Sequence, residues 1–346
     1  MMSANVFRDF LTAVETAAAL LNPQGQRLAV ELPRDPSHGD WTTNAAMVLA
    51  KAVGKPPRAV AEELLPKLTA LPDVVKAEVA GPGFINVTMS PAFWQRHLSD
   101  ILKAGIAYGD SDMGGNVGFN IEYCSANPTG PMHTAHARGT CLGDALANLL
   151  HKVGYKVMRE YYVNDAGVQV VVLARSTYLR YREALGEEIG EIPKGLYPGE
   201  YLKDVAQALI ARDGKKWQGK EEAEWLEPVK DFAMNMLLDA IKRDLASLNV
   251  HMDVFTSEKA IRDSGKVDGA YQLLKSKDLI YTGILEKPKG KEIPDWEPVE
   301  LELFRATQFG DDTDRPVRRG DGTYTYLMPD IAYHNDKFLR AGPMMT

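Results

Sequence analysis

The sequence predicts an α/β protein in two parts: an α+β domain over residues 1–112, then a larger domain over 113–341 with a parallel sheet covered by helices. Apolar residues at helical spacing alternate with short apolar runs that are typical of strands. GDSDMGGNVG, at 109–118, has four glycines in ten residues and is the expected linker. After it, a strand, a Gly/Pro-rich loop, a helix and a second strand form a βαβ unit, whose strands are parallel.

The elements of the first part follow from local patterns. Val6, Phe10 and Val14 lie at helical spacing among other apolar residues, which predicts an amphipathic helix. Pro57 suits the first turn of a helix, because its missing N–H has no partner there in any case. In chain order we expect a helix over 5–21, a strand over 28–33, helices over 42–53 and 57–70, and two strands within 74–89 that Gly81-Pro82-Gly83 separates.

The second part continues the α/β pattern. The Gly- and Lys-rich stretch 186–221 is typical of an exposed insertion, and the inserted segment as a whole is expected around 186–250. The expected elements are strands over 118–125, 155–165 and 251–258, helices over 135–153, 169–185 and 222–248, a charged loop with some β character over 289–304, and a strand running into a helix over 322–338.

Composition excludes several classes of protein. The 40 Lys and Arg against 47 Asp and Glu give a net charge of −7, which argues against a generally basic nucleic-acid coat. Cys124 and Cys141 are the only cysteines, so a disulfide framework is excluded and a reducing cytosol fits. The first residues lack the apolar core of a signal peptide, and we find no apolar run of the roughly 18–20 residues that a membrane span needs.

The segment SANPTGPMHTAH, at 125–136, carries most of the chemistry. His133 and His136 are three residues apart, so at the start of a helix both can face the same side. The free N–H groups and the positive dipole of a helix N-terminus attract phosphate. Two imidazoles there add donors that can follow the charge developing when a nucleotide α-phosphorus is attacked. Pro128 and Gly130 would fix the loop against such a ligand.

Two other interpretations of this histidine pair stay open at this point. A metal can bind two histidines at this spacing, although the sequence lacks an evident third ligand. Two unrelated surface histidines are common in any protein. The context of strand, Pro/Gly loop and helix favours the phosphate site, because ligands of parallel sheets bind at the carboxyl ends of the strands.

At the level of whole motifs the sequence resembles a known family. NIEYCSANPTGPMHTAH, followed by ARGTCLGDALANLL, resembles the signature region of class I aminoacyl-tRNA synthetases, and within that class the bacterial-type arginyl-tRNA synthetases. EYYVNDAGVQV, DVFTSE, FGDDTDRPV and GTYTYLMPDIAYH resemble later blocks of that family. ELPRDPSHGDWTTNAAMVLAK and VAGPGFINV resemble its N-terminal domain. The resemblance implies a Rossmann-like class I catalytic domain over 113–341, preceded by an accessory domain over 1–112 that binds tRNA.

The implied activity is that of an arginine–tRNA ligase, which activates L-arginine with ATP and transfers it to tRNA(Arg). His133 and His136 would be catalytic, because they match the histidines of the class I H-I-G-H motif. ATP, with Mg²⁺, would enter as a substrate, with no tightly bound cofactor and no protein-bound metal. The ATP-binding positions would be Thr129, Gly130, His133, Ala135 and His136. Ala135 departs from the family pattern, which has Gly there because adenine packs on the backbone, so we expect weakened ATP binding.

The resemblance also implies how arginine is held. Tyr326, Asp330 and Glu258 would grip the guanidinium, which carboxylates can meet in a bidentate fork. Without the family context, a strand aromatic, a helix N-terminal carboxylate and a surface charge are the alternatives for these three. The α-amino end would contact Glu122, Ser125 and Asn127. A carboxylate at 122, on an apolar strand, calls for a cationic partner, and the substrate is one candidate.

Other polar residues have weaker assignments. Asn164 and Asp165 end the second strand and would orient the substrate or the site loops, or form an ordinary turn. The acidic run 311–314 is either an Mg²⁺-nucleotide site or, as we favour, a solvated turn. The resemblance implies that the accessory domain meets the tRNA elbow. Its candidate contacts are Asn44, Phe84, which can stack on a base or belong to the core, and Asn86.

The family's sequence continues beyond what is present here. No K-M-S-K occurs in the 346 residues, and 342–346 (GPMMT) does not resemble the family's continuation. We therefore expect a catalytic domain that is incomplete at its C-terminus, in a cytoplasmic chain of a usually monomeric family, with weak or no ligase activity. The alternatives are a non-catalytic tRNA-binding remnant, another class I aminoacyl-tRNA synthetase, and an H-x-G-H nucleotidyltransferase.

Overall fold

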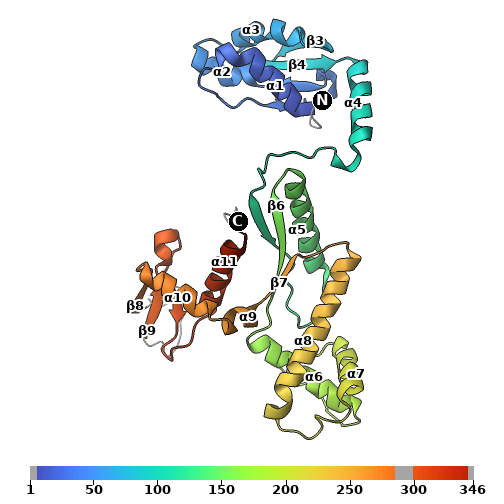
Figure 1. Cartoon of the computed structure of the whole chain (residues 1–346), viewed down its shortest axis with the longest axis vertical. Coiled ribbons are helices and arrows are strands. Elements are labelled where there is room, and N and C mark those ends of the chain that lie inside the picture. Colours follow the sequence, from blue (N-terminus) through green and yellow to red (C-terminus); the bar gives the residue numbers. More distant parts are fainter. Residues whose placement is uncertain (1–5, 285–298, 342–346) are drawn as a thin grey trace. The chain divides into compact units, whose positions relative to one another are not determined.

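The computed structural model describes residues 6–284 and 299–341, and the chain divides after Asp112 into two compact units (Figure 1). We call them the N-terminal unit and the C-terminal unit and describe each by itself. Within the described ranges, no helix is both long enough and apolar enough to cross a membrane.

The N-terminal unit is a four-stranded antiparallel sheet with helices. Its strands are β1 (Val30–Glu31), β2 (Trp41–Thr43), β3 (Val74–Ala80) and β4 (Phe84–Met89), in the order β1-β2-β4-β3. Its helices are α1 (Val6–Ala18), α2 (Ala45–Val53), α3 (Pro57–Thr69) and α4 (Pro91–Ala104), with short 3-10 turns at Ala19–Leu21, Pro36–His38 and Gly105–Ala107. Ser90 caps α4 by accepting a hydrogen bond from the Phe93 N–H, at 3.1 Å.

Aromatic rings from three elements form the core of the N-terminal unit. The Phe10 ring of α1 stacks on Trp41 of β2 with ring centres 4.9 Å apart, and lies 5.6 Å from Phe93 of α4. Trp41 is fully buried, and leucines of α2 and α3 pack around the same cluster. One continuous apolar core therefore holds the helices on the sheet.

The C-terminal unit begins with a three-stranded parallel sheet of order β5-β6-β7, made of β5 (Gly118–Glu122), β6 (Lys156–Val163) and β7 (Val254–Ser257). Helix α5 (Thr134–Lys152) connects β5 to β6. Three helices lie in the chain between β6 and β7, namely α6 (Val168–Ala184), α7 (Tyr201–Asp213) and α8 (Glu222–Ser247) (Figure 1). The predicted α/β class with a parallel sheet is confirmed.

A second, antiparallel sheet of order β10-β9-β8 follows, which was not predicted from the sequence. The elements after β7 are α9 (Glu258–Asp263), α10 (Lys266–Ser276), β8 (Ile280–Ile284), β9 (Glu300–Phe304), a 3-10 turn (Ala306–Phe309), β10 (Arg315–Arg318) and α11 (Leu327–Ala341). Helix α11 returns to the first sheet. There Lys337 pairs with Glu122 of β5, and Arg340 binds the fully buried Glu160 of β6 at 2.6 Å.

Three predictions about local structure need correction. The stretch 186–221 is not simply exposed, because α7 buries Leu202, Val205 and Leu209 against α6 and α8. No strand occupies 322–326; an isolated bridge joins Arg318 to Tyr324, and α11 then begins. Residues 42–43 belong to β2 rather than to a helix. The predictions for 289–298 and for the tail 342–346 lie outside the described residues.

Candidate active site at the carboxyl edge of the parallel sheet

The loop that leaves β5 has an unusual backbone. Cys124 and Ser125 are consecutive non-glycine residues with positive φ, at 67° and 40°. Such conformations are sparsely populated and persist where the surroundings fix them. Here Ser125 donates its hydroxyl hydrogen to Glu122 Oε1 at 3.0 Å and accepts the Tyr162 N–H at 3.1 Å. Ser125, expected to contact arginine, therefore anchors the loop to both strands.

The next part of the loop is tied to β6 and to α6. The Tyr161 hydroxyl donates to the Ala126 carbonyl at 2.6 Å, from a ring that is fully buried. The Asn127 amide donates to Gln169 Oε1 at 2.9 Å and stays exposed. These contacts bring the loop over the carboxyl ends of the strands, where a parallel sheet binds its ligands.

The two histidines lie together at the start of α5. His133 is the residue before the first helical turn, and its ring stacks on that of His136 with centres 3.6 Å apart and planes 17° apart. The His133 N–H points to His136 Nδ1 at 3.4 Å. Burial, and then the nearby His133, lower the pKa of His136, which favours its neutral form at pH 7. Ala135, between them, is exposed.

The N-terminus of α5 can therefore bind an anion. Backbone N–H groups of the first turn have no partner within the helix, and the helix dipole is positive there. The His136 imidazole, whose lowered pKa favours the neutral form, adds a directional N–H donor there. The arrangement suits a polyphosphate that lies across the first turn of the helix.

Glu122, at the end of β5, is satisfied from within the chain. Its Oε2 accepts hydrogen bonds from Lys337 and, at 3.1 Å, from the Tyr333 hydroxyl, while Ser125 holds Oε1. Lys337 is only 5% exposed, and its ammonium lies 4.2 Å from the centre of the Tyr333 ring. The cation that the sequence argument required for Glu122 is thus Lys337 of α11.

Two further carboxylates lie near Glu122. Glu258, at the start of α9, is 9% exposed, and its Oε1 accepts two hydrogen bonds from Arg262, from Nη2 at 2.6 Å and from Nε at 2.9 Å. The Asn164 amide lies 2.9 Å from Glu258 Oε2 in the orientation that satisfies it. Burial raises the pKa of Asp330, on the first turn of α11, and the negative charges of Glu258 and Glu122 raise it further.

Glu122, Glu258 and Asp330 form a carboxylate cluster, in which Lys337 pairs with Glu122 and Arg262 pairs with Glu258. Burial raises the pKa of Tyr162, and the charges of Glu258 and Asp330 add to that rise. A shifted pKa at Asp330 means that its charge is incompletely compensated by the protein. A cationic ligand that reached this cluster would therefore be attracted to it.

Other residues singled out from the sequence have different surroundings. Tyr326 comes just before α11 and is 74% exposed. Asp165 is buried and accepts hydrogen bonds from Ser257 Oγ at 2.5 Å and Lys259 N at 2.8 Å, so it anchors the turn between β7 and α9. A bidentate contact from Arg315 lowers the pKa of Asp311 to about 2.

Two carboxylates of the acidic run 311–314, those of Asp311 and Asp314, are thus bound within the chain, since Asp314 accepts hydrogen bonds from the hydroxyls of Thr307 and Tyr281, each at 2.8 Å. Among the residues that the structure describes, no group of three or more His, Cys, Asp or Glu side chains is placed to hold a metal ion.

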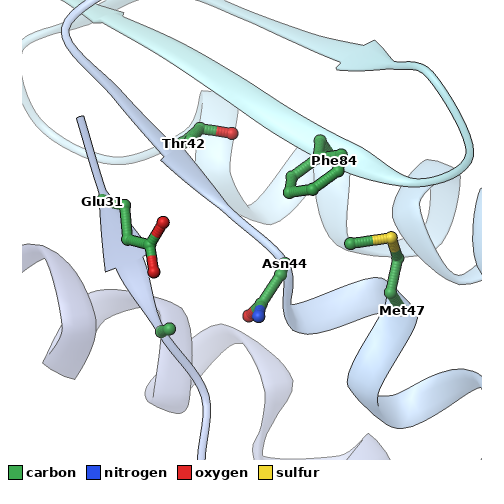
Figure 2. A pocket seen from close by; sticks show the side chains of 6 residues that line it. Glu31, Thr42, Asn44, Met47 and Phe84 are labelled. Carbon is green, nitrogen blue, oxygen red and sulfur yellow. The ribbon is translucent and has the colours of Figure 1, made fainter. Parts of the chain in front are cut away.

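The N-terminal unit carries a separate pocket of about 160 Å³. Figure 2 shows Glu31 on one side, Phe84 and Met47 on the other, and Asn44 between them. The remaining lining residues are Ala29 and Thr42. The Phe84 ring is 37% exposed, and the buried Asn44 Oδ1 has no hydrogen-bond partner among the described residues. Asn86 is buried on β4 and does not line the pocket.

Sequence reasoning missed Tyr333, Lys337 and Tyr201, all of which contact the site. Tyr333 and Lys337 are four residues apart on α11, a spacing that places them on one helix face. Nothing local connects that face to Glu122, which lies 215 residues from Lys337 in the chain. Tyr201 lies within 186–221, the stretch that the sequence predicted to be an exposed insertion.

The fold and the site match those of known proteins. The model of the class I tRNA synthetase (R) catalytic domain matches residues 97–341, and that of the arginyl-tRNA synthetase N-terminal domain matches 7–89. The chain therefore contains a class I aminoacyl-tRNA synthetase catalytic domain, in which the histidine pair follows β5 of the parallel sheet.

Individual relatives are more specific. The arginine–tRNA ligase of Parvibaculum lavamentivorans is 54% identical over 344 residues, which are 97% of this chain and 59% of the relative. A crystal structure of a putative arginyl-tRNA synthetase from Campylobacter jejuni is 33% identical, with a TM-score of 0.62 over 74% of this chain and 53% of that one. Arginyl-tRNA synthetase of Thermus thermophilus, at 22% identity, shares the fold, with a TM-score of 0.64 over 98% of this chain and 53% of that one.

The chain belongs to the arginyl-tRNA synthetase family. It spans 59% of the length of the curated relative from P. lavamentivorans.

Proposed function

We propose that this chain carries the amino-acid activation site of an arginine–tRNA ligase. The reaction joins L-arginine to ATP, giving arginyl-adenylate and pyrophosphate, and then transfers the arginyl group to the 3′ end of tRNA(Arg). The observation that carries the proposal is the meeting, at one sheet edge, of a histidine pair on a helix N-terminus with the carboxylate cluster. The first suits polyphosphate and the second suits a guanidinium.

On the nucleotide side, His133 and His136 donate hydrogen bonds to the phosphates of ATP, which enters with Mg²⁺ as a substrate. A carboxylate oxygen of arginine attacks the α-phosphorus, the bond to the β-phosphate oxygen breaks, and pyrophosphate leaves with the electron pair. The two imidazoles stabilise the charge on the α-phosphoryl oxygens in the transition state. Thr129, Gly130 and Ala135 supply the adjoining backbone, against which the nucleotide packs.

On the amino-acid side, Asp330 and Glu258 pair with the guanidinium, and Tyr326 closes over it from the exposed side. The raised pKa of Asp330 supports this role, because a bound cation would stabilise its ionised form. Asn127, Ser125 and Glu122 contact the α-amino end. Since Lys337 already neutralises Glu122, the exposed side-chain amide of Asn127 is the main polar contact of the α-amino end of arginine.

The strength of the activity is a separate part of the proposal. The family's K-M-S-K lysine contacts the ATP phosphates, and no such motif occurs in these 346 residues. Losing one such charged contact lowers a rate by about 10²–10³. We expect the purified 346-residue polypeptide to bind arginine and ATP but to exchange pyrophosphate into ATP weakly.

ATP–pyrophosphate exchange tests this directly, with and without arginine and with and without tRNA(Arg). Slow exchange that requires arginine supports both the assignment of the substrate and the predicted weak activity. Rapid exchange contradicts the predicted weak activity, and exchange at a rate that does not depend on arginine contradicts the assignment of the substrate. The proposed reaction takes place in the cytoplasm, where protein synthesis consumes arginyl-tRNA.

We also propose that the N-terminal pocket takes one base of tRNA. Phe84 offers a half-exposed ring for stacking, and Asn44, whose Oδ1 has no hydrogen-bond partner among the described residues, lines the pocket beside it. Asn86 supports the strand beneath, opposite Thr42 in the sheet register. The pocket also favours the alternative function, a tRNA-binding chain without catalysis. Filter binding of tRNA(Arg), combined with an adenylate assay on the same preparation, separates the two.

A further inference from the structure

A tyrosine of the inserted helices contacts the loop that precedes the histidine pair. Tyr201, the first residue of α7, donates its hydroxyl hydrogen to the Thr129 carbonyl at 2.6 Å. Burial raises the pKa of Tyr201, so the phenol remains a protonated donor over the physiological range. The contact joins elements 72 residues apart in the chain.

Two glycines allow the tyrosine ring to lie this close to backbone. A Cβ on Gly130 would come 3.3 Å from the Tyr201 hydroxyl oxygen, which is tighter than most side chains permit. A Cβ on Gly199 would come 2.2 Å from the same ring, which is impossible without movement. The ring is thus fitted between the loop and the chain that leads into α7.

The segment before Tyr201 is itself fixed to α6. Arg180, which is 7% exposed, donates to the Pro198 carbonyl at 3.0 Å, and Ser176 Oγ accepts the Tyr197 N–H at 2.9 Å. Tyr201 also packs on the cluster that contains the fully buried Leu202. The hydroxyl therefore projects from a rigid support rather than from a free loop.

The other side of the loop is held in the same manner from the sheet. Tyr161 donates to the Ala126 carbonyl at 2.6 Å, so two phenols hold two carbonyls three residues apart. Between them, the Thr129 N–H donates to the Asn127 carbonyl at 2.7 Å and forms a tight turn. The turn leads through Gly130 to His133.

We propose that Tyr201 is a positioning residue for ATP binding. Its hydrogen bond fixes the turn at Thr129 and so sets where the loop presents the start of α5 and its histidines to the phosphates. The inserted helices α6 to α8 then form part of the nucleotide site through this bond. The identity of the ligand, ATP, rests on the proposed function. The role of Tyr201 in fixing the turn at Thr129 does not depend on it.

The test compares Tyr201→Phe with Tyr178→Phe. Tyr178 makes the same kind of bond within the inserted helices, from its hydroxyl to the Trp217 carbonyl at 2.8 Å, away from the loop. Each variant loses one hydroxyl and keeps its ring. A merely structural role predicts that both variants behave alike.

Two measurements are made on the 346-residue chain and both variants. Hydrogen exchange followed by mass spectrometry reads the amides of 126–133, and titration with ATP and Mg²⁺, then with L-arginine, reads affinity. For Tyr201→Phe we expect roughly three- to tenfold faster exchange of the loop amides, a similar loss of ATP affinity and unchanged arginine affinity. Tyr178→Phe should change none of these.

The outcomes separate the two proposals. Equal loop exchange in the two variants would overturn the positioning role, as would equal ATP affinity where the parent chain binds ATP. If the parent chain binds no ATP but Tyr201→Phe alone loosens the loop, the positioning of the turn stands and the nucleotide assignment fails.

Discussion

The N-terminal and C-terminal units hold a helix on a sheet in opposite ways. In the first, α1 meets the sheet through Phe10 stacked on Trp41, within one continuous apolar core. In the second, α11 meets the parallel sheet through two ion pairs, Lys337 with Glu122 and Arg340 with Glu160, beside the ring of Tyr333 against that of Tyr162. An apolar contact between a helix and a sheet costs less free energy than a buried ion pair, because buried charges must be desolvated.

We relate this difference to the function that each helix–sheet contact serves in addition to stabilising the fold. Helix α11 carries Asp330 of the carboxylate cluster, so its position relative to β5 sets the shape of the proposed arginine site. Paired charges tolerate only one register between helix and strand, whereas apolar side chains can repack. We infer that the ion pairs fix α11 at the site, and that the N-terminal unit has no such demand on its core.

The largest expected effect tests the ion pairs themselves. Arg340→Met leaves the fully buried Glu160 without its cation and should lower the free energy of unfolding of the C-terminal unit by roughly 3–5 kcal/mol. Denaturant-dependent hydrogen exchange measures this, because it reads the two units separately. The N-terminal unit should be unchanged.

The matched control is Arg58→Met. Arg58 lies 3.5 Å from Glu62 on the N-terminal unit, with both side chains more than 60% exposed. Such a pair is worth about 0–1 kcal/mol. Similar losses from the two variants would show that the charges under α11 are ordinary surface charges.

Acid should act on the same pair. Burial alone would raise the pKa of Glu160, but hydrogen bonds from Thr256, Arg340 and Asn120 lower it below its ordinary 4.5. The stability that this group contributes is therefore complete above pH 4.5 and is lost as the pH falls through the lowered pKa. Glu160→Gln should reduce the dependence of the unfolding free energy on pH in that range. An unchanged pH dependence would show that Glu160 does not contribute to acid unfolding.

A smaller effect concerns the carboxylate cluster. Asp330→Asn should weaken binding of L-arginine by roughly tenfold to a hundredfold, since it removes one charge-assisted partner of the guanidinium. Calorimetric titration measures the affinity, and ATP affinity serves as the internal control. Unaltered arginine binding would place the guanidinium elsewhere.

The pH dependence of that binding has a definite sign. The pKa of Asp330 is raised above its ordinary 3.8, and a bound cation would lower it. Arginine affinity should therefore fall as the pH drops through the raised pKa, and arginine binding should release protons there. In Asp330→Asn this component disappears. Affinity that rises on acidification would contradict the assignment.

In the N-terminal unit, Phe84→Ala should weaken tRNA(Arg) binding by about tenfold if a base stacks in the pocket. Phe84→Trp, which keeps a stacking surface, is the matched variant. Filter binding compares them at one fixed salt concentration, because phosphate contacts depend on salt. Equal binding by the parent and Phe84→Ala would remove the pocket from the tRNA surface.

The smallest expected change concerns Ala135, where the family pattern has glycine. Ala135→Gly should improve ATP affinity a few-fold by letting adenine approach the backbone, while the first turn of α5 loses about 0.5–1 kcal/mol of helix preference. Titration with ATP and a melting curve measure the two effects. Weaker ATP binding in the glycine variant would show that the methyl group is part of the site.

The sequence was informative where the chemistry is local. His133 and His136, three residues apart at a helix start, were predictable as a pair, and so was the parallel arrangement of β5 and β6 around α5. Helix α7 was missed because the glycines around it suggested an exposed loop. Its signal was nevertheless present, in the helical spacing of Leu202, Val205 and Leu209.

Contacts made only in the folded chain could not be predicted. Glu122 called for a cation, but the choice of Lys337, 215 residues away, depends on how α11 returns to the sheet. The same holds for Tyr201, whose hydroxyl reaches Thr129 only because α7 packs on α6. In both cases the packing of distant helices, and not the local sequence, determines the partner.

We propose above all that the carboxyl edge of the parallel sheet binds arginine through the charge of its guanidinium. Citrulline has the same shape with a neutral urea group, so calorimetric titration of the 346-residue chain with L-arginine and with L-citrulline isolates that charge. The account predicts that arginine binds at least tenfold more tightly, and that Asp330→Asn narrows the difference. Equal binding of the two ligands, or no binding of either, would contradict it.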